Sequence, residues 1–139
     1  MAVRLNPYLN FRDNTREVME FYKAAFGGDL RMTTFKEGGM SQGGADADLI
    51  MHAMLEGSNG ITLMASDIPP GTHDFTVGDN ISISLSGDDD SALRGYWQKL
   101  SAGGQVTMPL EPAPWGDTFG MFTDKFGVQW LVNILGQKS

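Results

Sequence analysis

The sequence predicts an α+β protein built from two tandem βαβββ modules, because one succession of patterns occurs twice along its 139 residues. In residues 6–35 and again in residues 80–110, a short alternating run leads through a polar turn to an amphipathic helical segment, a Gly-Gly pair and a second extended run. The stretches that follow also correspond, since residues 60–66 and 127–133 both begin at glycine and continue as a largely apolar strand. Such a repeat is typical of two equivalent units that bury apolar faces.

We therefore expect a single domain with three parts. Module one spans about 1–67, a linker spans 68–79, and module two spans about 80–139. A chain of 139 residues is long enough for a substantial core. Because each module combines one helix with about four alternating strands, we expect the helix to cover one face of each sheet. The uncovered faces should together form a concave mixed surface, which is a favoured place for ligands.

The first half of module one is typical of a strand followed by a helix. Residues 7–11 alternate, which places Tyr8 and Asn10 on one side of the strand. The polar residues 13–15 indicate a helix start, and the glycines 27–28 indicate a helix end. Between them, apolar side chains recur at three- and four-residue spacing and predict one buried helical face: Val18, Met19, Phe21, Tyr22 and Phe26.

The second half of module one is typical of strands. Residues 30–36, 49–56 and 61–66 predict three of them, and residues 57–60 form a hairpin turn. Residues 37–47 are rich in glycine and lack a periodic pattern. This stretch is either a passive connector or a lid over a site.

Module two repeats this order. Residues 81–86 alternate, with Ser82 and Ser84 on one face. The acidic residues 88–90 predict a capped helix start rather than a metal-binding loop. The remaining elements are a helix with Leu93, Tyr96, Trp97 and Leu100 on its apolar face, a glycine pair at 103–104, and strands at 106–110, 120–123 and 128–134.

Two tryptophans in the last quarter of the chain have different predicted roles. Trp130 alternates with Val128 and Val132, which favours packing in the core. Trp115 lies in a proline-rich loop. An exposed indole there would cover a ligand, a partner subunit or a helix.

The composition excludes several classes of function. The net charge of −7 and the isoelectric point near 4.6 disfavour binding to nucleic acid and to anionic membrane surfaces. The chain has no cysteine, which excludes disulfides, thiol nucleophiles and cysteine metal sites. No apolar run reaches the ~20 residues of a membrane span, and the first residues do not resemble a signal peptide. A cytoplasmic protein is therefore expected.

Several short strings along the chain carry a resemblance to a known family. They are EFY at 20–22 with FGG at 26–28, DKFG at 124–127, MHA at 51–53, LMASD at 63–67, NIS at 80–82, WGD at 115–117 and FGVQW at 126–130. With these strings the chain resembles the vicinal oxygen chelate superfamily, which includes glyoxalases, bleomycin-resistance proteins and extradiol dioxygenases, and within it the PhnB-like branch. That branch is often labelled demethylubiquinone methyltransferase-like, but no Gly-rich strand-to-helix loop followed by an acidic ribose binder supports a methyltransferase here.

The resemblance implies where a metal ion would lie. Metal-dependent members hold a divalent ion with His, Gln or Glu side chains from the first and last strands of each module. Three or four such ligands would suit Zn, Ni, Mn or Fe. The corresponding positions here hold no credible ligand set, so we expect no metal and no other cofactor. These positions are Leu131 and its repeat mate Met64 on the last strands, Pro7 or Tyr8 on the first strand of module one, and Ser82 or Ser84 in module two.

Strand alternation and the family motifs together predict the wall of a binding cavity. His52 is its candidate catalytic residue, because histidine titrates near neutral pH, although a partly buried structural role is the simpler interpretation. The mixture of apolar and neutral polar groups suits a small, weakly polar organic ligand. The predicted ligand-binding residues are Tyr8, Asn10, His52, Met54, Met64, Ser66, Ser82, Ser84, Trp115, Gln129, Leu131 and Asn133.

Three hypotheses for function follow from the sequence. The first is a metal-independent binding protein for a small organic molecule, which we expect to form a homodimer. The second is a lyase, isomerase or dioxygenase whose divalent metal is held by unconventional ligands such as His52 and Glu56. The third is an interaction module that docks another protein through a sheet edge or Trp115.

Overall fold

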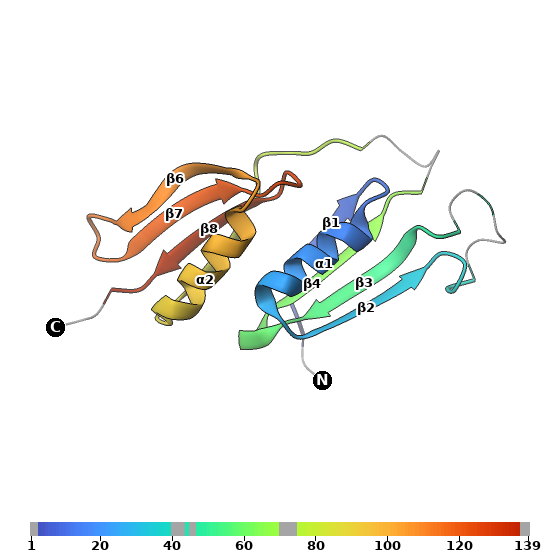
Figure 1. The fold of residues 1–139 in the computed structure, drawn as a ribbon, viewed down its shortest axis with the longest axis horizontal. Coiled ribbons are helices and arrows are strands. Elements are labelled where there is room, and N and C mark those ends of the chain that lie inside the picture. Colours follow the sequence, from blue (N-terminus) through green and yellow to red (C-terminus); the bar gives the residue numbers. More distant parts are fainter. Residues whose placement is uncertain (1–2, 40–43, 45–46, 70–74, 137–139) are drawn as a thin grey trace. The chain divides into compact units, whose positions relative to one another are not determined.

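The computed structural model of the protein describes residues 3–39, 44, 47–69 and 75–136. The chain divides into two compact units at residues 1–76 and 77–139. Each unit contains one α-helix and one four-stranded mixed sheet (Figure 1). The predicted α+β fold of two βαβββ modules is therefore confirmed, and the units are called module one and module two below.

Module one has its strands in the order β1-β4-β3-β2. Strand β1 is parallel to β4, whereas the β4–β3 and β3–β2 pairs are antiparallel. The turn of 3-10 helix at Ser58–Gly60 joins β3 to β4 and confirms the predicted hairpin. The other elements are β1 (Tyr8–Phe11), α1 (Thr15–Phe26), β2 (Asp29–Thr34), β3 (Ile50–Glu56) and β4 (Thr62–Asp67).

Module two has the same topology, with the strand order β5-β8-β7-β6. Strand β5 is parallel to β8, and the other two pairs are antiparallel. Its elements are β5 (Ile83–Gly87), α2 (Asp90–Ser101), β6 (Gln105–Pro112), β7 (Thr118–Thr123) and β8 (Gln129–Ile134).

Each helix packs its apolar stripe on one face of its own sheet, as predicted (Figure 1). In module one, Val18, Met19 and Tyr22 are fully buried, while Phe21 lies beside the stripe and is only half-buried. In module two, Trp130 is 1% exposed, which confirms its predicted place in the core. Its ring stacks on Phe122 at a centroid distance of 6.4 Å.

The glycine pair after each helix serves the same purpose in both modules. A Cβ atom added at Gly28 would overlap the backbone oxygen of Glu56, at the end of β3. A Cβ atom added at Gly104 would overlap the backbone oxygen of Thr123, at the end of β7. The second glycine of each pair thus lets the chain pass close to the third strand of its module, which is a stronger requirement than the helix cap predicted from sequence.

The start of α1 differs from the prediction. Asn14 occupies the N-cap position directly before the helix, but its side chain makes no capping hydrogen bond. Instead the backbone N–H of Thr15 donates to Oδ1 of Asp67 at 3.0 Å, and the N–H of Ile50 donates to Oδ2 at 2.8 Å. A buried carboxylate from the end of β4 therefore caps α1 and ties it to the start of β3. In α2 the prediction holds, because the Asp89 side chain accepts a hydrogen bond from the N–H of Ala92.

Two strands of module two have different limits from those predicted. Strand β5 begins at Ile83, so Ile81 and Ser82 precede it, and Ile81 is 76% exposed. Strand β6 is longer than predicted and includes Pro109 and Pro112. Because β6 lies at the edge of its sheet, the missing N–H groups of these prolines remove no hydrogen bond that a central strand would need.

The predicted lid lies partly outside the described residues, at 40–43 and 45–46, and so does part of the predicted linker, at 70–74. At the start of the lid segment, the N–H of Thr34 donates to the carboxylate of Glu37, whose own N–H donates to Oγ1 of Thr34. Hydrogen bonds to the carboxylate from the Thr34 backbone, and then from the Thr34 side chain, hold the pKa of Glu37 below its ordinary value. The lid itself stays a prediction.

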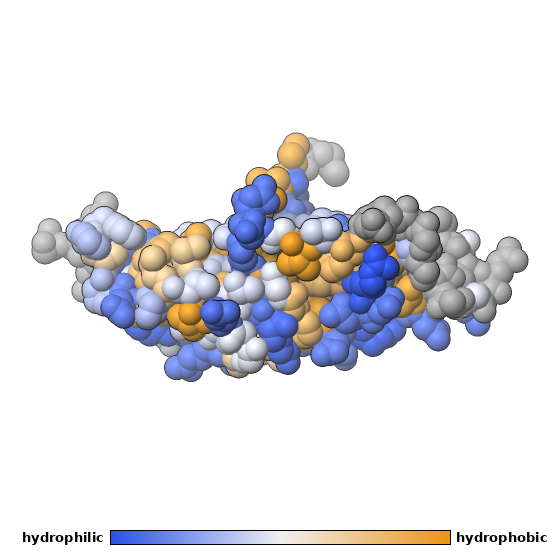
Figure 2. Space-filling view, turned by 90° about the horizontal axis from the view of Figure 1, so that it is seen from above, coloured by the Kyte–Doolittle hydropathy of each residue, from blue (hydrophilic) through white to orange (hydrophobic). Residues whose placement is uncertain are grey.

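The surface carries large apolar side chains among hydrophilic ones, as the face seen in Figure 2 shows. Exposed apolar residues are common on folded proteins and do not by themselves mark a site. The most exposed of them are Val3, Leu5, Ile81, Trp115, Val77 and Leu135.

Candidate functional site

The open face of module one, meaning the face of its sheet that does not carry α1, holds six of the predicted binding residues. The strand register places their side chains in two adjacent rows that cross the four strands. The first row, in sheet order from β2 to β1, is Arg31, Met54, Met64 and Tyr8. The second row is Thr33, His52, Ser66 and Asn10.

Tyr8 and His52 meet on this face although they lie on strands that are not neighbours. The Tyr8 hydroxyl lies 3.4 Å from Nδ1 of His52, and the ring centroids are 5.9 Å apart. A hydrogen bond of this length is weak. The tyrosine ring therefore reaches over β4 toward the half-buried imidazole and forms a polar pair above the sheet.

The other members of the two rows supply a mixed lining. Ser66 donates its hydroxyl hydrogen to Oδ1 of Asn10 at 3.2 Å. Met54 and Met64 lie directly opposite each other and are half-buried, so their thioethers form an adaptable apolar floor beside the polar pair. The structure thus brings together all of the sequence-predicted binding residues of module one.

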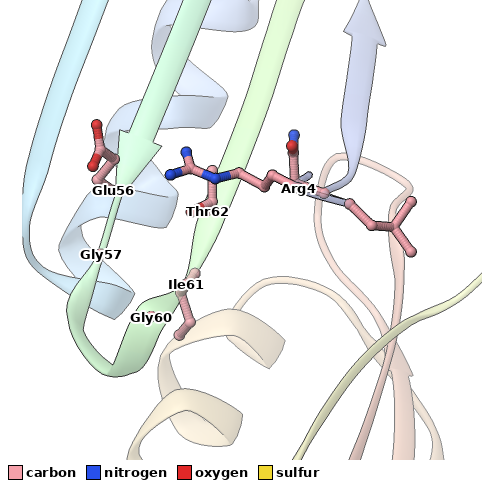
Figure 3. Close-up of a pocket in the computed structure, with 8 residues that line it drawn as sticks. Arg4, Glu56, Gly57, Gly60, Ile61 and Thr62 are labelled. Atoms are coloured by element: carbon pink, nitrogen blue, oxygen red, sulfur yellow. The ribbon is translucent and has the colours of Figure 1, made fainter. Parts of the chain in front are cut away.

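A cleft of about 330 Å³ lies at the hairpin end of this sheet. Figure 3 shows the Arg4 side chain extending across Thr62 toward Glu56, on the face away from α1. The β3–β4 turn also lines the cleft, at Gly57 and Gly60. Its volume is at the lower end of the range for small-molecule sites. No periodic pattern in the sequence points to Arg4, because the residue precedes the first strand.

The open face of module two is more apolar. Ser84 lies opposite Leu131, Leu131 lies opposite Met121, and Met121 lies opposite Met108. Of the remaining predicted residues, Gln129 and Asn133 flank Leu131 on the same side of β8. Ser82 is not part of that strand array, because β5 begins one residue later.

Asn133 has a structural partner. Its side-chain amide donates to Oδ2 of Asp117 at 3.0 Å, and the N–H of Gly136 donates to Oδ1 at 2.9 Å. The bond from Asn133, followed by the one from Gly136, holds the pKa of Asp117 below its ordinary value. These contacts fix the turn that presents Trp115, which is 61% exposed and meets Phe119 edge-to-face at 5.6 Å.

This lowered pKa predicts how acid acts on module two. Since folded Asp117 binds its proton less readily than unfolded Asp117, its contribution to stability is complete above about pH 4 and is lost as the pH falls through the lowered pKa. We expect the free energy of unfolding to fall less steeply below about pH 4 in Asp117→Asn than in the wild type. Urea unfolding followed by circular dichroism at several pH values measures this slope. Parallel curves for the two proteins would contradict it.

The register decides between the alternatives that the sequence left open opposite Met64 and Leu131. Tyr8, rather than Pro7, lies opposite Met64, and Ser84, rather than Ser82, lies opposite Leu131. Thioether sulfur is a poor ligand for Zn, Ni, Mn or Fe(II), the leucine side chain has no donor atom, and neutral hydroxyls bind such ions weakly. The donor set at these four positions therefore does not fit a divalent metal.

The alternative pair of ligands fits no better. His52 and Glu56 lie four residues apart on β3, so about 13 Å of strand separates them, with Met54 between. Two ligands of one ion must both lie about 2 Å from it. Among the residues that the structure describes, no group of three or more His, Asp or Glu side chains is arranged to hold a metal ion.

Two buried carboxylates have structural partners that the sequence did not reveal. Asp67 holds the start of α1, as described above. Asp124 is 3% exposed and accepts hydrogen bonds from the N–H groups of Phe126 and Val128 and from Nε1 of Trp130. The only signal was that each acidic residue follows or ends an otherwise apolar strand.

In the described part of the chain, none of the helices is both long and apolar enough to cross a membrane.

Comparison with known proteins gives one family over most of the chain. The profile of the Glyoxalase/Bleomycin resistance protein/Dioxygenase superfamily matches residues 4–132. Protein YjdN of Escherichia coli is 24% identical over 146 residues, which covers 96% of this chain and 97% of that protein.

Two solved structures give the same picture. Protein PA1353 from Pseudomonas aeruginosa is 40% identical, with a TM-score of 0.83, and the match covers 98% of this chain and 100% of that one. The PhnB protein from Bacillus cereus is 24% identical, with a TM-score of 0.74 and coverage of 95% and 99%. This likeness shows a shared fold and agrees with the PhnB-like branch predicted from the sequence motifs.

Proposed function

Because this chain belongs to the glyoxalase/bleomycin resistance protein/dioxygenase superfamily, we propose that it binds a small organic molecule on the open faces of its sheets, without a divalent metal ion. One observation carries the proposal. At the four positions that correspond to the family's ligands, the register pairs Tyr8 with Met64 and Ser84 with Leu131. These side chains suit contact with an organic surface better than coordination of a cation.

The open faces have the chemistry of a small-molecule site. In module one, the Tyr8–His52 pair and the Ser66–Asn10 bond supply hydrogen-bonding groups around a methionine floor. In module two, leucine and methionine side chains lie beside the Ser84 hydroxyl. The concave surface expected from the sequence stays a prediction. Homodimer formation and a cytoplasmic location also stay predictions.

Titration with metal ions tests whether the protein is free of a divalent metal site. Calorimetric titration of untagged protein with Zn²⁺, Ni²⁺, Mn²⁺ and Fe²⁺ is expected to show no stoichiometric binding. The double variant Ser84→His/Leu131→Glu is the positive control, because it places an imidazole and a carboxylate opposite each other on neighbouring strands. It should gain measurable Zn²⁺ affinity. Tight stoichiometric binding by the wild type would overturn the metal-independent proposal.

A thermal-shift screen of small organic compounds tests whether the open faces bind a small organic molecule. A compound that raises the melting temperature should bind less tightly to His52→Ala and to Ser84→Phe, which fills the open face of module two. Ser91→Phe is the matched control, because Ser91 lies exposed on α2. Equal loss of binding in Ser84→Phe and Ser91→Phe, or no hit in a broad screen, would contradict binding on the open faces. His52 remains the candidate acid–base group, and catalysis itself stays a prediction.

A further inference from the structure

The two rows on the open face of module one have a charge pattern unlike that of the whole chain. The chain holds 17 acidic against 10 basic residues. Yet the two rows defined above contain one arginine, one histidine and no carboxylate. The nearest acidic positions on this face, Asp29 and Glu56, belong to the next row toward the hairpin. Arg31 is therefore the one formally charged side chain of the two rows, and a positive charge in an otherwise neutral array favours an anionic ligand.

Arg31 is placed to meet such a ligand. It lies opposite Met54 and diagonally from His52, a separation that a long side chain spans. The side chain is exposed, and within the described residues no carboxylate lies in ion-pair distance of its guanidinium. Its planar fork of donors matches the two oxygens of a carboxylate.

The Tyr8 contact orients His52 for the same role. When the Tyr8 hydroxyl donates to Nδ1, the neutral imidazole carries its proton on Nε2. The ring then offers an N–H donor from the atom that Tyr8 does not contact. Arg31 and His52 would therefore both donate to an acceptor placed above the first row.

We infer that the Arg31–His52–Tyr8 surface binds the carboxylate of a small organic acid, with the hydrocarbon part of the acid on Met54 and Met64. This inference rests on the proposed function and names the class of ligand for one of its two faces. Arg31 supplies the positive charge, His52 supplies a directional donor, and Tyr8 keeps the imidazole in place.

Benzoate and benzamide form a matched pair of probes, because they have similar shape and differ in charge. Titration of the full chain with each compound, followed by NMR of the histidine ring signals, reports binding at His52. The signals are assigned with His52→Gln. We expect benzoate to bind at least tenfold more tightly than benzamide, and Arg31→Gln to weaken benzoate about tenfold. Arg16→Gln is the control for loss of one positive charge, since Arg16 is exposed on α1. It should leave benzoate affinity unchanged.

Four outcomes would overturn the inference, and they differ in what they mean for the proposed function. Equal affinity for benzamide and benzoate would reject a carboxylate ligand but keep a small-molecule site on this face. Equal weakening by Arg31→Gln and Arg16→Gln would show general charge attraction in place of a built site. No binding of benzoate, while neutral compounds from the thermal-shift screen bind, would reject the ligand class alone. Inorganic phosphate, run as a further arm, should bind more weakly than benzoate, and tighter binding would reject the organic acid.

Discussion

Replacement of Asp124 by alanine is expected to lower the free energy of unfolding by about 4 kcal/mol, a large part of the stability of an ordinary domain. The Asp124 carboxylate is buried and accepts hydrogen bonds from two backbone N–H groups of the β7–β8 turn and from the Trp130 indole. Alanine would remove this acceptor from the indole N–H inside the core. Unpaired buried donors cost more than a lost surface contact, because they have given up water.

Urea unfolding followed by far-ultraviolet circular dichroism measures this loss. Asp88→Ala is the matched control, because it removes the same charge from an exposed position before α2 and should change stability by less than about 0.5 kcal/mol. Asp124→Asn should be intermediate, since its amide keeps one acceptor oxygen but turns a donor toward the indole N–H. A free energy for Asp124→Ala within about 1 kcal/mol of the wild type would show that the turn does not depend on this carboxylate.

Gly104→Ala is expected to destabilise the protein by about 3 kcal/mol through steric overlap. The added methyl group would meet the backbone oxygen of Thr123 and the backbone of Asp124, neither of which can move as a side-chain end can. The cost is mainly steric, because Gly104 is not among the glycines with positive φ. The equivalent glycine of module one, Gly28, combines the same overlap with a φ of +92°.

Gly95→Ala is the control for this prediction. Gly95 lies within α2, and a Cβ atom there meets nothing within 4 Å. Alanine should therefore stabilise the helix by up to about 1 kcal/mol. In thermal and urea unfolding, the change in the free energy of unfolding should have opposite signs in the two variants if Gly104 is needed for the close approach of the chain to β7. A neutral Gly104→Ala would mean that β7 moves away from the glycine at little cost.

Local patterns were enough to predict the elements and their order. The helix stripes, the hairpin at 57–60 and the inward position of Trp130 all depend on spacing within a few residues. The strand limits were less accurate. Ser82 looks like a strand residue because it alternates with isoleucines, but β5 begins after it, where pairing with β8 begins.

Contacts between distant parts of the chain could not be predicted in the same way. Asp67 caps a helix that begins 52 positions earlier, and Tyr8 reaches His52 across an intervening strand. Such contacts depend on sheet order and register, which a pattern along one strand does not specify. The register also decided between Tyr8 and Pro7 as the position opposite Met64.

Each sheet is covered by a helix on one face only, and this division has an evolutionary consequence. Substitutions on the helix side must fit a close-packed interior, whereas the opposite side is free to vary as long as the strands still pair. The repeat mates show such drift: His52 in module one corresponds to Phe119 in module two, and Tyr8 corresponds to Ser84. Two modules of one topology can thus share a scaffold while their open faces carry different chemistry.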